Sequence, residues 1–296
     1  MKRNIFNATF EESLNLKDDS LIDYMDKDTH KLPDPSTQSE KSKARIFGYI
    51  IVIFMIGTAF LISFICTKGF EGKLGESPFP KPNINFLPLK IFWVLFFVWL
   101  CITLIFRDRG EYFMSRFKGL FNMNTYIIWL VIEINLFFIT FFSTTLTISV
   151  IISFFLILLF LAYFIFQNKI RTIKNILFTE HYEQNKLDKF FEKIITTIIK
   201  YGSIIVTVGI IWKIIFPNSV GRTDTIGLIT FVLICIFVDI VLIFAEAYLL
   251  FPYLLYGYYK EKYSEDYRLY EGKTQLEWYG EKYFDKYIKG TKLEGK

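Results

Sequence analysis

Six long apolar runs constrain the fold of this chain more than any other feature of its sequence. They cover residues 46–66, 90–106, 125–142, 147–166, 198–216 and 225–250. A bilayer core about 30 Å thick is crossed by roughly 20 apolar residues in helical conformation, and only helices or closed barrels satisfy backbone polar groups in lipid. The chain is also 53% hydrophobic, more than a soluble domain of this length usually is. We therefore predict an all-α, polytopic integral membrane protein, a bundle of six transmembrane helices.

The distribution of basic residues predicts the orientation of these helices. If the N-terminus is cytoplasmic, the inner segments hold 23 Lys and Arg residues, with the N-terminal tail counted only from Lys41, and the outer loops hold five. Because Lys and Arg are enriched on the cytoplasmic side, we expect cytoplasmic N- and C-termini in a multi-pass protein of the plasma membrane. The abundance of Ile, Phe, Lys, Asn and Tyr is typical of an AT-rich bacterial genome.

Three further segments flank or interrupt the predicted transmembrane domain of residues 46–250. Residues 1–45 mix eight basic with nine acidic side chains, which predicts a largely flexible cytoplasmic tail with one short helix at the capping box "TFEE". Residues 167–197 keep helical apolar spacing on both sides of "TEHYEQN", so the fourth and fifth helices should extend into the cytosol as a helical hairpin. Residues 251–296 should form two short helices at the inner face, after a kink at Pro252.

Three acidic side chains interrupt the apolar runs, two of them in "FVDIVLIFAEAYLL" at residues 237–250. Glu133 should lie roughly 12 Å from the cytoplasmic side and Asp239 roughly 21 Å from the outer side, which places both in the cytoplasmic half of the bilayer. Glu246 should lie close to the inner boundary. Because a charge at the centre of a span costs about 2.5–3.5 kcal/mol, these carboxyls should avoid lipid.

Helical spacing groups these carboxyls with other polar residues into one predicted intramembrane cluster. We expect an ion pair between Lys200 and Glu246, with Glu133 and Asp239 deeper in the same crevice. Two interpretations remain open: a proton- or cation-linked site that opens to the cytoplasm, or neutral acids that hold the helices in register. The predicted members are Tyr126, Glu133, Thr140, Lys200, Ser203, Thr207, Asp239, Glu246 and Tyr253.

The C-terminal segment is rich in tyrosine and contains a similar pattern twice, "EKYSEDY" at 261–267 and "EKYFDKY" at 281–287. Tyrosine suits a boundary between apolar and wet surroundings, because its ring is apolar and its hydroxyl is polar. Each pattern lines up three tyrosines on one helical face, which should pack against the loops of the protein itself or dock a partner protein. The two faces consist of Tyr259, Tyr263 and Tyr267, and of Tyr279, Tyr283 and Tyr287.

Motifs of known membrane chemistry are absent from the sequence. The two histidines, His30 and His181, lie outside the apolar runs, and no GxxxxGK[ST] loop or nucleophile-elbow serine occurs. We therefore expect no metal site, no cofactor and no catalytic residues. The net charge of +5 is too small to indicate nucleic-acid binding.

The sequence leaves three hypotheses for the function. The first is a non-catalytic membrane protein that acts through binding, such as an immunity protein that protects the bacterial membrane from a toxin. The second is a small proton- or cation-linked transporter or channel that uses Glu133, Asp239 and Glu246. An enzyme of a kind without recognisable motifs is the third. The expected partners are the lipid bilayer and, under the first hypothesis, a protein partner or toxin; no nucleic acid is expected, and the oligomeric state stays open.

Overall fold

The regular structure of the chain is helical wherever it is described. A computed structural model describes residues 3–30, 38–74, 81–106, 112–142, 147–179, 186–215 and 225–295. Within these ranges four helices are long and apolar enough to cross a membrane, and a fifth apolar helix, α4 (Leu89–Ile105), is shorter. The four long segments are Ile46–Phe70, Phe113–Phe142, Ile148–Phe178 and Cys235–Lys262. The fold is therefore that of a helical membrane protein.

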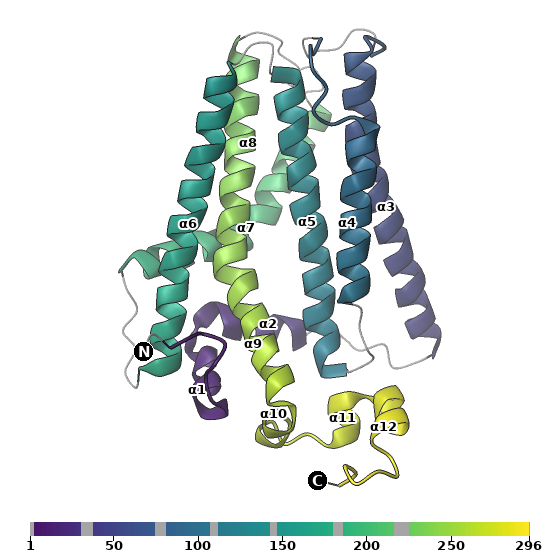
Figure 1. Ribbon diagram of the computed structural model, residues 1–296, viewed down its shortest axis with the longest axis vertical. Coiled ribbons are helices and arrows are strands. Elements are labelled where there is room, and N and C mark those ends of the chain that lie inside the picture. Colours follow the sequence, from purple (N-terminus) through teal and green to yellow (C-terminus); the bar gives the residue numbers. More distant parts are fainter. Residues whose placement is uncertain are drawn as a thin grey trace.

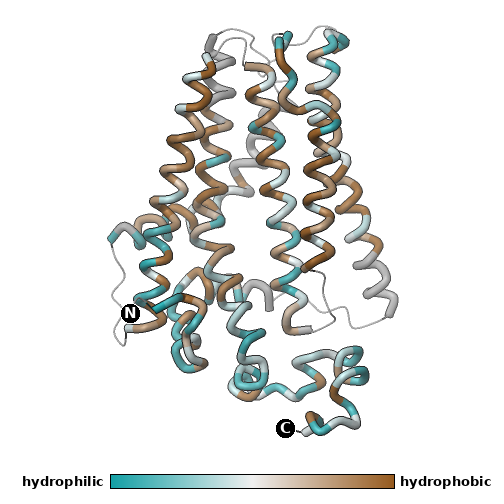
Figure 2. Tube along the Cα trace, viewed as in Figure 1, coloured by the Kyte–Doolittle hydropathy of each residue, from teal (hydrophilic) through white to brown (hydrophobic). Residues whose placement is uncertain are grey.

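The long helices stand side by side and alternate in direction along the chain (Figure 1). Apolar residues follow their length, and hydrophilic residues are concentrated at the end that carries both termini (Figure 2). We call this the terminal end of the bundle. The helices are α3 (Gln38–Phe70), α4, α5 (Tyr112–Phe142), α6 (Ile148–Phe178), α7 (Lys186–Ile215) and α8 (Thr225–Ala245), which continues into a π-helix η3 (Glu246–Leu250) and α9 (Phe251–Lys262).

The bundle consists of two groups of three helices. Helices α3, α4 and α5 contact one another, and α6, α7 and α8 contact one another. Among the described residues, the most extensive contact between the two groups joins α5 to α8 and to its continuation α9. The first group starts at the terminal end and the second at the opposite end (Figure 1), so the two groups have inverted directions.

The π-helix η3 marks the place where α8 passes into α9. Pro252 is near the first residue of α9 and has no backbone N–H to donate to the carbonyl one turn earlier. In a π-helix each N–H bonds to the carbonyl five residues earlier. Here the N–H of Phe251 bonds to the carbonyl of Glu246. The sequence predicted a kink at Pro252, and the structure has a π-helix directly before it.

The N-terminal segment is folded against the terminal end of the bundle, whereas the sequence predicted a largely flexible tail. Its helices are α1 (Phe10–Leu14), η1 (Asn15–Asp18) and α2 (Ser20–His30). The predicted capping box is present, because the Thr9 hydroxyl accepts from the N–H of Glu12 and the Glu12 carboxylate accepts from the N–H of Thr9. Residues 3–30 dock on the bundle through apolar side chains, because Ile5, Ala8, Leu16 and Ile22 are buried.

The C-terminal segment forms three short helices where the sequence predicted two: α10 (Ser264–Tyr270), α11 (Gln275–Tyr279) and α12 (Glu281–Tyr287). The break after α10 lies in the predicted "EGKTQ", where Gly272 has a φ of 64° that favours glycine. Helices α6 and α7 extend toward the terminal end as predicted for the 167–197 hairpin, but the tip of that hairpin, 180–185, lies outside the described residues.

Candidate functional site

Helices α5 and α8 are joined by a carboxyl and an amide in the middle of the bundle. The amide nitrogen of Asn135 donates to Asp239 Oδ1 at 2.8 Å and to the carbonyl of Val131 at 3.0 Å. Asp239 is 6% exposed, so this carboxyl is shielded from lipid by the helix that it contacts. The second bond, to the carbonyl four residues earlier on α5, fixes the orientation of the Asn135 amide.

A second pair of the same kind lies nearer to the terminal end. The Asn124 amide nitrogen donates to Glu246 Oε2 at 3.1 Å, and Asn124 is 6% exposed. Asn124 and Asn135 are eleven residues apart, which places them on one face of α5. Asp239 and Glu246 are seven residues apart and share a face of α8 in the same way. We call these four residues the acidic seam and its two contacts the acid–amide pairs.

Each acid–amide pair leaves two buried oxygen atoms without a hydrogen-bond donor. In the pair farther from the terminal end, Asp239 with Asn135, which we call the upper pair, these atoms are Asp239 Oδ2 and Asn135 Oδ1. In the lower pair, Glu246 with Asn124, they are Glu246 Oε1 and Asn124 Oδ1. Buried polar atoms in proteins nearly always have a partner, and the two pairs bring four unpartnered acceptors to one helix contact.

Glu133 does not belong to the acidic seam. It is fully buried and accepts a hydrogen bond at 2.7 Å from the indole nitrogen of Trp129. Tyr126 and Thr140, which were predicted in the same cluster, face α3 and the loop before α4. The Tyr126 hydroxyl donates to the carbonyl of Met55, and the Thr140 hydroxyl accepts from the N–H of Phe86. Two residues along a helix turn a side chain by about 200°, so Glu133 and Asn135 point away from each other. The single crevice predicted for Glu133 and Asp239 is not formed.

The predicted contribution of α7 to this cluster is also absent. Lys200 is exposed and lies 5.3 Å from the ring centre of Tyr201, whereas Glu246 bonds to Asn124, so the predicted Lys200–Glu246 ion pair was wrong. Thr207 is exposed as well, and the side chain of Ser203 lies outside the described part of the chain.

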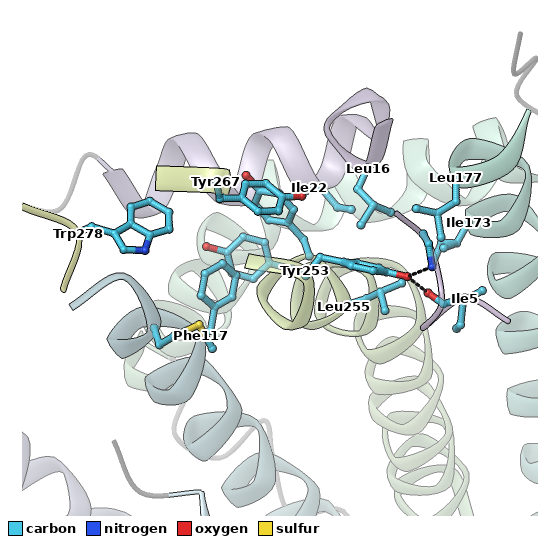
Figure 3. Close-up of a cluster of buried hydrophobic side chains, with 14 of the residues drawn as sticks. Ile5, Leu16, Ile22, Phe117, Ile173, Leu177, Tyr253, Leu255, Tyr267 and Trp278 are labelled. Carbon is cyan, nitrogen blue, oxygen red and sulfur yellow. Dashed lines mark hydrogen bonds between the residues drawn. The ribbon is translucent and has the colours of Figure 1, made fainter. Parts of the chain in front are cut away.

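Tyr253 is buried at the terminal end and not in the seam. Its ring stacks on Phe117 of α5 with 4.7 Å between ring centres. It belongs to an aromatic cluster that joins α5, α9 and the N-terminal segment (Figure 3).

One of the two predicted tyrosine faces binds the N-terminal segment. The Tyr259 hydroxyl donates to the carbonyl of Ile5 and accepts from the N–H of Ala8 (Figure 3). The Tyr263 hydroxyl donates to the carbonyl of Ala8 at 2.8 Å. The Tyr267 hydroxyl lies 2.9 Å from Ser13 Oγ, and burial, opposed in part by this hydrogen bond, raises the pKa of Tyr267 to about 12. This face therefore packs against the protein itself, the first of the two alternatives. We call residues 3–30 together with α10, α11 and α12 the terminal cap.

A buried ion pair anchors the terminal cap to α6. The Lys169 ammonium lies 2.5 Å from Asp19 Oδ2, and both side chains are almost completely buried. Asp19 also caps α2, because its Oδ1 accepts from the N–H groups of Leu21 and Ile22. No local pattern in the sequence indicates this pair, because Asp19 and Lys169 are 150 residues apart and Lys169 lies in the predicted cytosolic hairpin.

The same lysine contacts the π-helix. Its ammonium lies 4.8 Å from the ring centre of Tyr248, and the Tyr248 hydroxyl donates to Asp188 Oδ1 at 2.8 Å and accepts from the Asn168 amide at 3.0 Å. Tyr248, two residues after Glu246, thus joins α6 and α7 to η3.

The other tyrosine face is partly open. The Tyr279 hydroxyl donates to Glu265 Oε1 at 2.7 Å, and burial together with this carboxylate raises the pKa of Tyr279 to about 12. The Tyr283 ring lies between those of Tyr279 and Tyr287, and Tyr287 is 48% exposed. A surface pocket of about 280 Å³ is lined by Glu265, Gln275, Tyr279, Tyr283, Tyr287, Ile288 and Leu293.

Comparison of the chain with protein-family models, with curated proteins and with solved structures finds no match. Among the described residues, no group of three or more His, Cys, Asp or Glu side chains could hold a metal ion.

Proposed function

We propose that the protein is a small proton- or cation-linked transporter and that the acidic seam is its ion-binding site. The observation that carries this proposal is the placement of the two acid–amide pairs at the contact between the two three-helix groups, with four acceptor oxygens left without a donor. Ionisable residues inside a membrane domain commonly belong to ion pathways.

The inverted directions of the two groups support a transport role. Many secondary transporters consist of inverted halves that rock against each other around a site at their interface. In this chain that interface is the contact of α5 with α8 and α9. A movement of one group against the other would separate the amides of α5 from the carboxyls of α8 and so change the affinity for the bound ion.

We further propose that six helices cross the plasma membrane of a bacterium and that both termini are cytoplasmic. The excess of Lys and Arg in the inner segments, 23 against five, supports this orientation. The presence of the N-terminal and C-terminal helices at the same end of the bundle (Figure 1) is consistent with it. In that orientation the terminal cap is cytoplasmic and covers the inner end of the seam.

A binding role, such as that of an immunity protein, is the second candidate. It is favoured by the surface pocket between α10 and α12, where Tyr287 and Leu293 are about half exposed. The burial of Tyr259 and Tyr267 against the N-terminal segment removes one of the two faces that the sequence offered to a partner. We therefore place transport first.

The experiment is an ion-flux measurement on the full-length protein in liposomes. With an imposed membrane potential and a pH-sensitive dye or radioactive Na⁺ or K⁺, we expect flux above that of protein-free liposomes. Asp239→Asn should reduce it at least tenfold. Glu133→Gln is the matched control, because it neutralises an acid on the other side of α5 and keeps the acceptor for Trp129; its flux should equal that of the wild type. Absence of flux, or flux that survives Asp239→Asn, would exclude this function for the seam.

A further inference from the structure

We propose that the ligand of each acid–amide pair is a proton, which completes a doubly hydrogen-bonded ring between a carboxylic acid and an amide. This inference rests on the proposed function, because it names the ion that the seam would carry. It is drawn from a count of donors and acceptors at the two pairs.

The upper pair lacks one hydrogen atom. A primary amide has two N–H donors, and both donors of Asn135 are used, one by Asp239 Oδ1 and the other by the carbonyl of Val131. Since both partners can only accept, the amide cannot be turned round without losing both bonds. The atoms left over, Asp239 Oδ2 and Asn135 Oδ1, are both acceptors, and neither can satisfy the other.

One proton resolves this mismatch. It binds to Asp239 Oδ2, no other bond is made or broken, and the new O–H group donates to Asn135 Oδ1. The acid and the amide then exchange two hydrogen bonds in opposite directions, and the site is neutral. The lower pair has one amide bond, from Asn124 to Glu246 Oε2, and the same two unpartnered oxygens, so Glu246 Oε1 would take the proton and Asn124 Oδ1 would accept from it.

A metal cation fits the pairs less well. Ca²⁺ and Mg²⁺ take six or more oxygen ligands, and each pair offers two free oxygens. An ammonium or guanidinium partner is also absent, because within the described residues neither Asp239 nor Glu246 forms an ion pair. A proton needs only one oxygen to bind and one to receive the hydrogen bond, and it removes the charge that makes a carboxylate costly in a membrane.

Glu133 shows that this arrangement is specific to the seam. Its partner is the Trp129 indole, which has a donor and no acceptor. A proton on Glu133 therefore could not close a ring of the same kind. The amides Asn124 and Asn135 are thus the positioning residues that distinguish the seam acids from Glu133, the buried acid of α5.

The test is infrared spectroscopy of the full-length protein in lipid at neutral pH, in H₂O and in D₂O. A protonated carboxyl has a C=O stretching band that a carboxylate lacks. We expect the spectrum of the wild type minus that of the double variant Asp239→Asn/Glu246→Gln to contain this band. Asn135→Ala should shift the Asp239 component, because it removes both hydrogen bonds. Asn122→Ala is the matched control: it removes an amide from the same helix, outside both pairs, and should leave the band in place.

Two results would overturn the assignment. One is a difference spectrum with no carboxylic-acid band at neutral pH. The other is stoichiometric binding of Na⁺ or K⁺, measured by equilibrium dialysis, that Asp239→Asn abolishes. Failure of the proposed function gives a different pattern, because a band that depends on Asn135 together with no ion flux would support the protonated pairs and exclude transport. Flux with Na⁺ binding and no band would retain transport and exclude the proton.

Discussion

Loss of the Asp19 carboxylate should release the N-terminal segment from the bundle. Asp19 both neutralises the buried Lys169 and caps α2. Removal of one partner of a buried ion pair costs about 3–5 kcal/mol, and loss of an N-cap adds about 1 kcal/mol. At 1.36 kcal/mol per tenfold change, 3–5 kcal/mol corresponds to a roughly 150- to 5,000-fold rise in the population of the undocked segment.

Two variants separate the ion pair from the cap. Asp19→Asn removes the charge but keeps a capping residue as good as Asp, so its effect should be that of the ion pair alone. Asp19→Ala should lose the cap as well and exceed Asp19→Asn by about 1 kcal/mol. The double variant Asp19→Asn/Lys169→Met replaces the buried lysine by an apolar side chain of similar length, so it should recover most of the stability, because replacement of both partners of a buried pair is often neutral.

Hydrogen exchange measured by mass spectrometry on the lipid-reconstituted protein reports this undocking. Amides of residues 5–22 should exchange faster in the order wild type, Asp19→Asn, Asp19→Ala, while amides in the middle of α5 stay unchanged. The reasoning would be refuted if Asp19→Asn left the exchange of 5–22 within about threefold of the wild type, far below the change expected from a buried pair. It would also be refuted if the double variant exchanged as fast as Asp19→Asn.

Three further predictions concern the packing at the terminal end of the bundle. Gly257→Ala brings a Cβ within 2.5 Å of the Phe117 ring, so it should destabilise the protein by about 1–3 kcal/mol. Gly119→Ala meets nothing within 4 Å, so it should be neutral or stabilise by up to about 1 kcal/mol. Equal shifts of the melting temperature in detergent for the two variants would contradict this contrast. Tyr259→Phe removes the hydroxyl that bonds to the N–H of Ala8 and the carbonyl of Ile5. The loss should cost about 1–3 kcal/mol and increase amide hydrogen exchange of residues 5–9 only. Glu271 lies at the end of α10. Burial would raise its pKa, but Lys260 and Lys273 outweigh burial and hold the pKa below the ordinary value of 4.5. Its stabilising contribution is thus complete above pH 4.5 and lost as the pH falls below that value; Glu271→Gln should abolish this acid sensitivity of the C-terminal helices in exchange measurements, and a variant that stayed equally acid-sensitive would assign it to other groups.

The sequence predicted the helices of the bundle well, because an apolar run in lipid has almost no alternative to a helix. It predicted their ends less well. Helix α5 begins at Tyr112, thirteen residues before the apolar run that starts at Thr125, since its amphipathic start packs on the cap: the Phe113 ring stacks on Trp278. Contacts of this kind join residues that are far apart in sequence, as Ala8 and Tyr259 are. No local pattern in the chain indicates them.

The candidate site was predicted in part. Spacing placed Asp239 and Glu246 on one face of α8, and both do contact α5. Their amide partners were not among the predicted residues, because Asn124 and Asn135 carry no charge and stand out less in an apolar run. Asn124 and Asn135 are eleven residues apart on the third run, and this spacing repeats a helical face almost as closely as a heptad does. The two amides therefore mark the face of α5 that meets α8 and η3.

The acidic seam and the terminal cap meet in the π-helix η3. Glu246, its first residue, bonds to α5, and Tyr248, its third, contacts the lysine that pairs with Asp19 of the N-terminal segment. An ordinary α-helix turns by 100° per residue, and a π turn changes that angle locally, so the wider turn lets one short segment face both α5 and α6. Because Pro252 prevents a regular continuation of the helix, this turn is set by the chain itself. The contacts of Asp19 with Lys169, of Lys169 with Tyr248 and of Glu246 with Asn124 thus connect the N-terminal segment to the end of the seam nearest the terminal cap.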